Sequence, residues 1–228
     1  MTLPGDGQPV DEDFAWFLEQ FGAPTASQRV SSRTIAKFQG KLPDQLLEYW
    51  QRFGFCSFRM GLFSIVDPDE YEEDMETWIG DTDIVERDSY YVIARTSFGK
   101  LFLWGTHTGY MYNITPSLGW VYAEDRHSQK IKTEGADKYL RYFFSALTPE
   151  SVDSKGNDRK LLHDRATAKL GQLGSDEVFA FEPSLMTGGE AKLENIEKRN
   201  VHIHLSVLSQ LGHREVLDRA ALTKKAFG

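Results

Sequence analysis

The chain has 228 residues, 40% of them hydrophobic and 13% aromatic, so it has enough apolar material for a core and is not disordered as a whole. Its single cysteine, Cys56, excludes an internal disulfide and any multi-cysteine metal site. The formal charge of -8 argues against direct nucleic-acid binding, which requires a basic face.

The first predicted helix lies between two local signals. Asp11 is the candidate N-cap, and the helix is expected to end at Gly22. Between them, apolar residues repeat with the spacing of one helical face: Phe14, Phe17, Leu18 and Phe21. The next segment, Ala23–Gly40, lacks such a pattern and is predicted to be mostly irregular.

A second helix is predicted over Pro43–Phe53, because proline suits the first helical position and Gly54 follows as a stop signal. Its expected buried face consists of Leu46, Leu47, Trp50 and Phe53. Two strands are predicted next, Phe55–Phe58 and Leu62–Val66, on either side of a turn at Gly61.

The third predicted helix begins at Asp67-Pro68 and ends at Gly80. One face carries large apolar side chains: Tyr71, Met75, Trp78 and Ile79. At 100° per residue the opposite face carries four acids: Asp69, Glu70, Glu73 and Glu76. We therefore expect this helix to bury an aromatic stripe and to expose a ridge of carboxylates.

Four strands are predicted in the middle of the chain: Tyr90–Thr96, Lys100–Trp104, Tyr110–Ile114 and Trp120–Ala123. Their short separators favour antiparallel hairpins. The stretch Leu101–Ala123 contains no Asp, Glu, Lys or Arg, but glycines and a proline interrupt it, so we interpret it as strands and not as a membrane span. Met1–Phe14 has no basic or apolar run typical of a secretory signal. We expect a soluble, cytoplasmic protein with no membrane partner.

Helices are predicted again at Ala136–Leu147 and Arg159–Gln172, with the polar segment Thr148–Asp158 as a linker between them. A short strand and a last helix complete the pattern: Glu177–Phe181 and Ala191–Leu211. The tail after Gly212 is expected to be loosely held.

Together these elements predict an α+β fold. We expect a mixed, mainly antiparallel central sheet flanked by helices, with a helical C-terminal part. The linker predicts two domains, residues 10–147 and 148–214, the second packed on the first.

The negative charge is concentrated in the first part of the chain. Residues 1–90 hold 18 acids and 7 bases, whereas residues 91–228 hold 16 acids and 19 bases. Residues 67–88 alone contain 11 acids and one base, Arg87. Such a segment is either a solubilising surface or a docking face for a basic partner.

Enzyme chemistry finds little support in the residues. His202 and His204 could bind a metal if they lay on a strand, but the neighbouring apolar spacing favours a helix, on which they diverge. Cys56 could act as a nucleophile with His107 or His127, but its apolar neighbours favour a core thiol. Phosphate-binding loops and nucleophile elbows are absent from the sequence. We therefore expect no catalytic residues, no metal and no cofactor, and keep a small metal- or thiol-dependent enzyme as the alternative.

Several segments resemble a known family. Leu42–Trp50, Gly61–Phe63 and Val66–Tyr71, followed by Phe98–Trp104, resemble the GAD-like domain. Further along, Lys169–Leu173, Glu177–Pro183 and Thr187–Gly189, with Leu193–Ile196 and Leu205–Leu211, resemble the C-terminal domain of type VI secretion immunity proteins. The resemblance covers roughly residues 10–212 and assigns the two predicted domains to these families. The order of the first elements is also similar to the SUKH immunity superfamily.

The resemblance implies a non-catalytic immunity protein of the bacterial cytoplasm. Such proteins bind a cognate type VI effector, for this arrangement typically a DNase, and protect the producing cell and its kin. Combined with the charge pattern, it leads us to expect a 1:1 complex in which a basic nuclease domain contacts the acidic residues Asp69, Glu70, Glu73, Glu76, Asp81 and Asp83. A scaffold or RNA-associated adaptor remains a further alternative, because GAD domains also occur in tRNA-handling enzymes.

Overall fold

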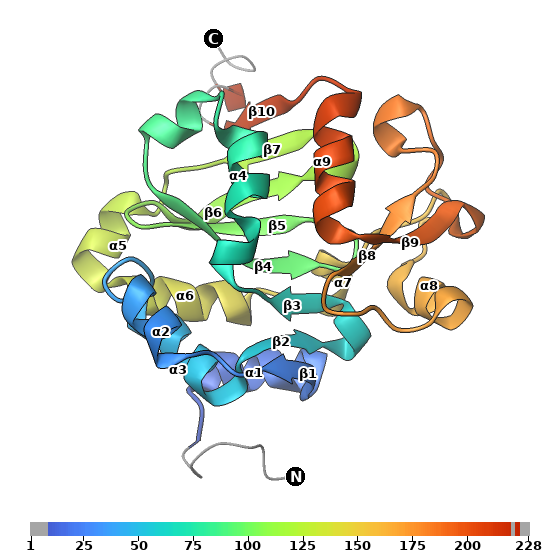
Figure 1. The fold of residues 1–228 in the computed structure, drawn as a ribbon. Helices are drawn as coiled ribbons and strands as arrows, with labels where there is room; N and C mark the ends of the chain where they lie inside the picture. The colour runs from blue at the N-terminus through green and yellow to red at the C-terminus, as the bar shows by residue number, and fades with distance from the viewer. Residues whose placement is uncertain (1–8, 220–221, 224–228) are drawn as a thin grey trace.

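The computed structural model describes residues 9–219 and 222–223. Its centre is an eight-stranded sheet in the order β1-β2-β3-β4-β5-β6-β7-β10 (Figure 1). All neighbouring strands are antiparallel except β7 and β10, which are parallel, so the predicted α+β class with a mixed, mainly antiparallel sheet is confirmed. The strands are β1 (Pro24–Gln28), β2 (Phe55–Phe58), β3 (Phe63–Ile65), β4 (Tyr90–Thr96), β5 (Leu101–Gly105), β6 (Gly109–Thr115), β7 (Trp120–Ala123) and β10 (Glu215–Asp218).

Helices cover both faces of this sheet, and a separate antiparallel ribbon lies beside it. The ribbon consists of β8 (Glu177–Phe181) and β9 (Ile196–Asn200). The helices are α1 (Glu12–Phe21), α2 (Ser32–Phe38), α3 (Asp44–Phe53), α4 (Glu72–Ile79), α5 (Ser128–Glu134), α6 (Ala136–Ser145), α7 (Pro149–Val152), α8 (His163–Leu170) and α9 (Val201–Leu211). Within the described residues, no helix is both long and apolar enough to cross a bilayer.

An aromatic core fills one side of the sheet, where α1, α3 and α6 pack. The predicted stripe of α1 is confirmed, since Phe14, Phe17 and Phe21 are buried and the Asp11 carboxylate accepts a hydrogen bond from Phe14 N at 3.1 Å. The Phe14 ring stacks on that of Tyr49 with centroids 3.9 Å apart. Burial and a hydrogen bond to Asp11 raise the pKa of Tyr49.

On the opposite side, α4 and α9 lie side by side over the middle of the sheet (Figure 1). Trp78 of α4 is fully buried, and its indole Nε1 donates to the carbonyl oxygen of Leu205 in α9 at 3.3 Å. The apolar faces of both helices therefore point at the sheet and at each other, which leaves their other faces open to solvent.

The C-terminal part has a small core of its own around Phe179, Phe181 and Phe98, the last contributed by the β4–β5 turn. It is joined to the sheet by a hydrogen bond from Phe179 N to Ser97 O at 2.7 Å. On α8, Asp164 forms an ion pair with Arg59 at 3.0 Å.

Three of the sequence predictions are wrong. Residues 23–40 are not mostly irregular, because they form the edge strand β1 and helix α2. Residues 196–200 of the predicted last helix form β9, and the helix begins only after Asn200, whose side chain accepts from His202 N and Ile203 N. The tail is not loosely held at residues 215–218, which pair with β7 as β10.

Tertiary contacts explain these errors. Strand β1 is polar and exposed, but the open edge of β2 supplies its hydrogen bonds. Strand β10 is held by the parallel pairing with β7 and by an ion pair between Arg87 and Asp218 at 2.7 Å. Two predictions fall partly outside the described residues, the absence of a secretory signal in Met1–Phe14 and the loosely held tail. The residues concerned are 1–8, 220–221 and 224–228.

Two smaller differences concern the segment after the sheet. Helix α5 was not predicted, and the predicted linker contains the short helix α7, whose Val152 is buried in the aromatic core. Thr148 begins α7 with a capping box. The helix predicted over Arg159–Gln172 is shorter, at His163–Leu170.

Candidate functional site

The acidic surface, defined as Asp69, Glu70, Glu73, Glu76, Asp81 and Asp83, lies along α4 and the turns on either side of it. The Asp67 side chain caps the turn before α4 by accepting from Asp69 N at 3.1 Å, and Pro68 fixes the backbone at its first position. All six acidic side chains are exposed, whereas Tyr71, Trp78 and Ile79 are buried. The predicted carboxylate ridge is therefore present.

Neighbouring cations neutralise half of this surface. Asp69 forms an ion pair with Lys37 at 2.5 Å, Asp81 with Arg214 at 2.5 Å, and Asp83 with Arg87 at 2.6 Å. Among the residues that the structure describes, no cation forms an ion pair with the three others: Glu70, Glu73 and Glu76. These three carboxylates are the part of the surface still available to a cationic partner.

The structure adds a residue pair that the sequence analysis missed. Asp74 lies on the buried side of α4, and its carboxylate contacts Nδ1 of His202 on α9 at 2.6 Å. This hydrogen bond raises the pKa of His202 in spite of its partial burial. The signal in the sequence was an acid at an apolar position of the helix, but its partner is 128 residues away.

We expect this pair to make stability depend on pH. Because the pKa of His202 is raised in the folded chain, its stabilisation is complete below the unfolded pKa of about 6.5 and is lost as pH rises through the folded pKa. His202→Asn keeps a short polar side chain without the charge. The free energy of unfolding of the wild type minus that of His202→Asn should be about 1 kcal/mol or less, given the exposure of His202, and should fall between pH 5.5 and 8.5.

Denaturant unfolding at each pH measures this difference. The buried His163 and His204, whose pKa values are lowered by burial, are present in both proteins and cancel in the comparison. A difference that rises with pH would contradict a charged His202–Asp74 pair.

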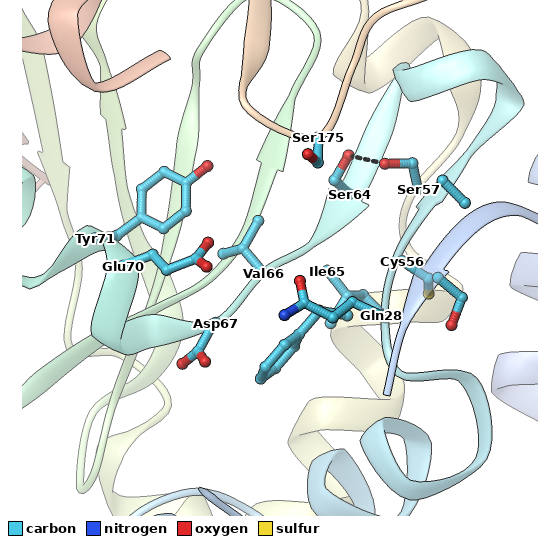
Figure 2. A pocket seen from close by; sticks show the side chains of 13 residues that line it. Gln28, Cys56, Ser57, Ser64, Ile65, Val66, Asp67, Glu70, Tyr71 and Ser175 are labelled. Atoms are coloured by element: carbon cyan, nitrogen blue, oxygen red, sulfur yellow. Dashed lines mark hydrogen bonds between the residues drawn. The ribbon is translucent and has the colours of Figure 1, made fainter. Parts of the chain in front are cut away.

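A pocket of about 270 Å³ with a mixed polar and apolar lining opens beside the acidic surface, between the turn before α4 and strands β1–β3 (Figure 2). Glu70, Tyr71 and Asp67 lie on one side of it, and the hydroxyls of Ser57 and Ser64 are hydrogen-bonded at 2.8 Å on another. Burial raises the pKa of Asp67. The pocket thus offers carboxylate and hydroxyl oxygens, which suit hydrogen-bond donors on a bound group.

A buried arginine, Arg95, is hydrogen-bonded to a residue of the pocket wall. Arg95 on β4 is 1% exposed, and its Nη2 donates to the carbonyl oxygen of Ser175 in the pocket wall at 2.6 Å. Nε and Nη1 of the same guanidinium have no hydrogen-bond partner among the described residues. Arg95 therefore anchors the loop before β8 to the central sheet.

The candidate catalytic groups from the sequence do not form a reactive arrangement. Cys56 lines the pocket but is 3% exposed, and burial raises the pKa of its thiol to about 12, far from a reactive thiolate. Among the residues that the structure describes, no histidine lines this pocket. His107 instead contacts Asp88 at 2.9 Å, and the His127 ring stacks on that of Tyr110. Within residues 9–219 and 222–223, no three His, Cys, Asp or Glu side chains are grouped to hold a metal ion.

Comparison with known families gives the decisive observation. Residues 12–118 match the GAD-like domain, and residues 137–212 match the C-terminal domain of the type VI secretion immunity protein Tdi1. The chain therefore combines a GAD-like domain with a C-terminal domain of the Tdi1 immunity family. Immunity proteins of this family are typically non-catalytic, and the match implies binding of a cognate type VI effector.

Known structures support the same fold. The crystal structure of Atu4351 from Agrobacterium tumefaciens superposes on this chain with a TM-score of 0.78 and 20% identity. The match covers 90% of this chain and 92% of the other. At this identity the likeness establishes a shared fold. No curated protein matches the chain in sequence.

Proposed function

We propose that this chain binds the toxin domain of its cognate effector in the bacterial cytoplasm, forms a 1:1 complex and blocks a DNase activity. The observation that supports the proposal is the exposed set of unpaired carboxylates on α4 and the turn before it: Glu70, Glu73 and Glu76. A DNase must present cations to phosphate, and the same cations attract this acidic surface.

The mechanism is occlusion. Carboxylates at the toxin's phosphate-binding surface compete with DNA for the same lysine and arginine side chains. Asp67 and Glu70 in the adjacent pocket extend the negative surface inward, where burial of Asp67 already makes its charge unfavourable without a partner. A cationic side chain from the toxin would neutralise this charge.

The experiment reverses the charge of the two unpaired carboxylates that lie on α4 itself, Glu73 and Glu76. We expect Glu73→Lys/Glu76→Lys to lower the association rate with the toxin domain by about tenfold or more at low salt, because steering depends on charge. The same variant should flatten the dependence of that rate on ionic strength. The partner is the toxin domain encoded by the reading frame next to this chain's gene, and surface plasmon resonance between 50 and 500 mM salt gives the rates.

The matched control is Glu12→Lys/Glu19→Lys on α1, which changes the net charge equally but lies on the opposite side of the sheet. Plasmid cleavage by the toxin, with each variant added, links binding to protection. Equal effects of the two double variants would mean that only the net charge of the chain matters and that the acidic surface is not a specific contact. Failure of the wild type to bind or inhibit the toxin would overturn the proposed function.

A further inference from the structure

Helix α9 exposes an apolar stripe, which consists of Ile203, Val207 and Leu211. Their exposed fractions are 66%, 47% and 43%, and the first is the highest of any large apolar side chain that the structure describes. Their spacing of four residues places them along one side of the helix. The inner side of α9 is already filled by Val201, Leu205 and Leu208.

A further exposed apolar side chain lies in an element that packs against the helix. Leu118, which is 41% exposed, belongs to the 3₁₀ turn Pro116–Leu118, and this turn packs against α9. Isolated exposed apolar residues are common on soluble proteins, whereas a row of three along one helix is typical of an interaction site.

The charges around the patch indicate the chemistry of its partner. Helix α4 lies next to α9 on the same side of the sheet (Figure 1). The unpaired and exposed Glu73 belongs to α4, and Glu70 belongs to the turn before it. Arg199 before α9 and Arg214 after it are both held in ion pairs, with Glu197 and Asp81. The combined surface is therefore apolar with an acidic border.

We infer that the α9 stripe is the desolvated centre of the effector interface, and that the α4 carboxylates form its charged rim. The inference rests on the proposed function and specifies the partner surface: an apolar patch bordered by lysine and arginine side chains. Apolar centres provide most of the binding energy, and rim charges set the association rate.

Other occupants fit the charges less well. A bilayer with anionic lipids attracts basic segments and would repel the acidic border. A second copy of this chain would bring two acidic surfaces of like charge together.

The test is Ile203→Asp/Val207→Asp in the full-length chain, with the adjacent-gene toxin domain as the binding probe. We expect the dissociation rate to rise about 30-fold or more without a fall in the association rate, because the added acids do not weaken attraction to a basic toxin. Glu73→Lys/Glu76→Lys should give the opposite signature, a lower association rate. The matched control is Trp16→Asp, which places the same acid at a 49% exposed apolar position on α1. Circular dichroism melting of each variant separates lost binding from lost folding.

Two results would overturn the inference. One is a dissociation rate that matches the wild type in a folded double variant. The other is a wild-type dimer, seen by light scattering, that the double variant dissociates, since the stripe would then serve self-association. If the wild type itself fails to bind, the proposed function falls with the inference, whereas binding that survives the double variant removes the inference alone.

Discussion

Phe17→Ala should destabilise the chain by about 3–5 kcal/mol, the usual range for a buried phenylalanine truncated in a rigid core. Phe17 is fully buried, and its ring contacts rings from three other elements: Phe58 on β2 at 4.9 Å, Phe63 on β3 at 5.5 Å and Phe144 on α6 at 5.2 Å between centroids. Truncation removes these contacts and leaves a cavity that connected helices and strands cannot close. Because domains are stable by about 5–15 kcal/mol, the variant should be close to unfolding at 37 °C.

The preceding residue provides the control. Trp16 is larger but 49% exposed, so Trp16→Ala should cost about 1 kcal/mol or less. Urea unfolding followed by circular dichroism gives both values. Similar losses in the two variants would contradict the position of α1 against the sheet.

Gly54→Ala should cost about 3 kcal/mol or more and should weaken the pairing of β1. Gly54 ends α3 with φ 74° and ψ -172°, a conformation that is essentially restricted to glycine and costs other residues about 1–3 kcal/mol. A Cβ there would lie 2.7 Å from Ser27 Oγ and closer still to the carbonyl oxygen of Gln28. The added methyl would therefore push β1 away from the sheet edge.

A second glycine separates the cost of the backbone conformation from the cost of the steric clash with β1. Gly22 ends α1 with almost the same backbone, φ 79° and ψ -177°, but a Cβ there would meet no atom within 4 Å. Gly22→Ala should therefore cost only the backbone part, and hydrogen exchange of the β1 amides should accelerate in Gly54→Ala alone. Equal losses of stability in both variants would contradict the close approach of β1 to Gly54.

The arrangement of α4 and α9 connects stability with the proposed interface. Trp78 and Asp74 of α4 contact Leu205 and His202 of α9, so the two helices are held in register by a buried hydrogen bond and an ion pair. The exposed faces of these helices carry the unpaired carboxylates and the apolar stripe. Their relative position is therefore set by buried contacts and is available before any partner binds, which lowers the ordering cost of association.

Local sequence patterns by themselves determined most of the elements and the acidic ridge. Periodic apolar residues in α1, α3 and α4, with capping signals such as Asp11, specify helices because these interactions occur within a few residues. The exposure of Glu73 and Glu76 follows from the same periodicity. The pairing of Asp83 with Arg87, four residues apart on a turn, is also a local relation.

Only the tertiary structure decided what depends on distant partners. Strands β1, β9 and β10 lack strong patterns of their own and form because β2, β8 and β7 supply hydrogen bonds. Lys37 neutralises Asp69 from 32 residues away and Arg214 neutralises Asp81 from 133 residues away, so the number of free carboxylates could not be obtained from composition. The apolar face of α9 that stays exposed became visible only once β8, β9 and α4 had covered the rest of the helix, because burial is a property of the packed molecule and not of the segment.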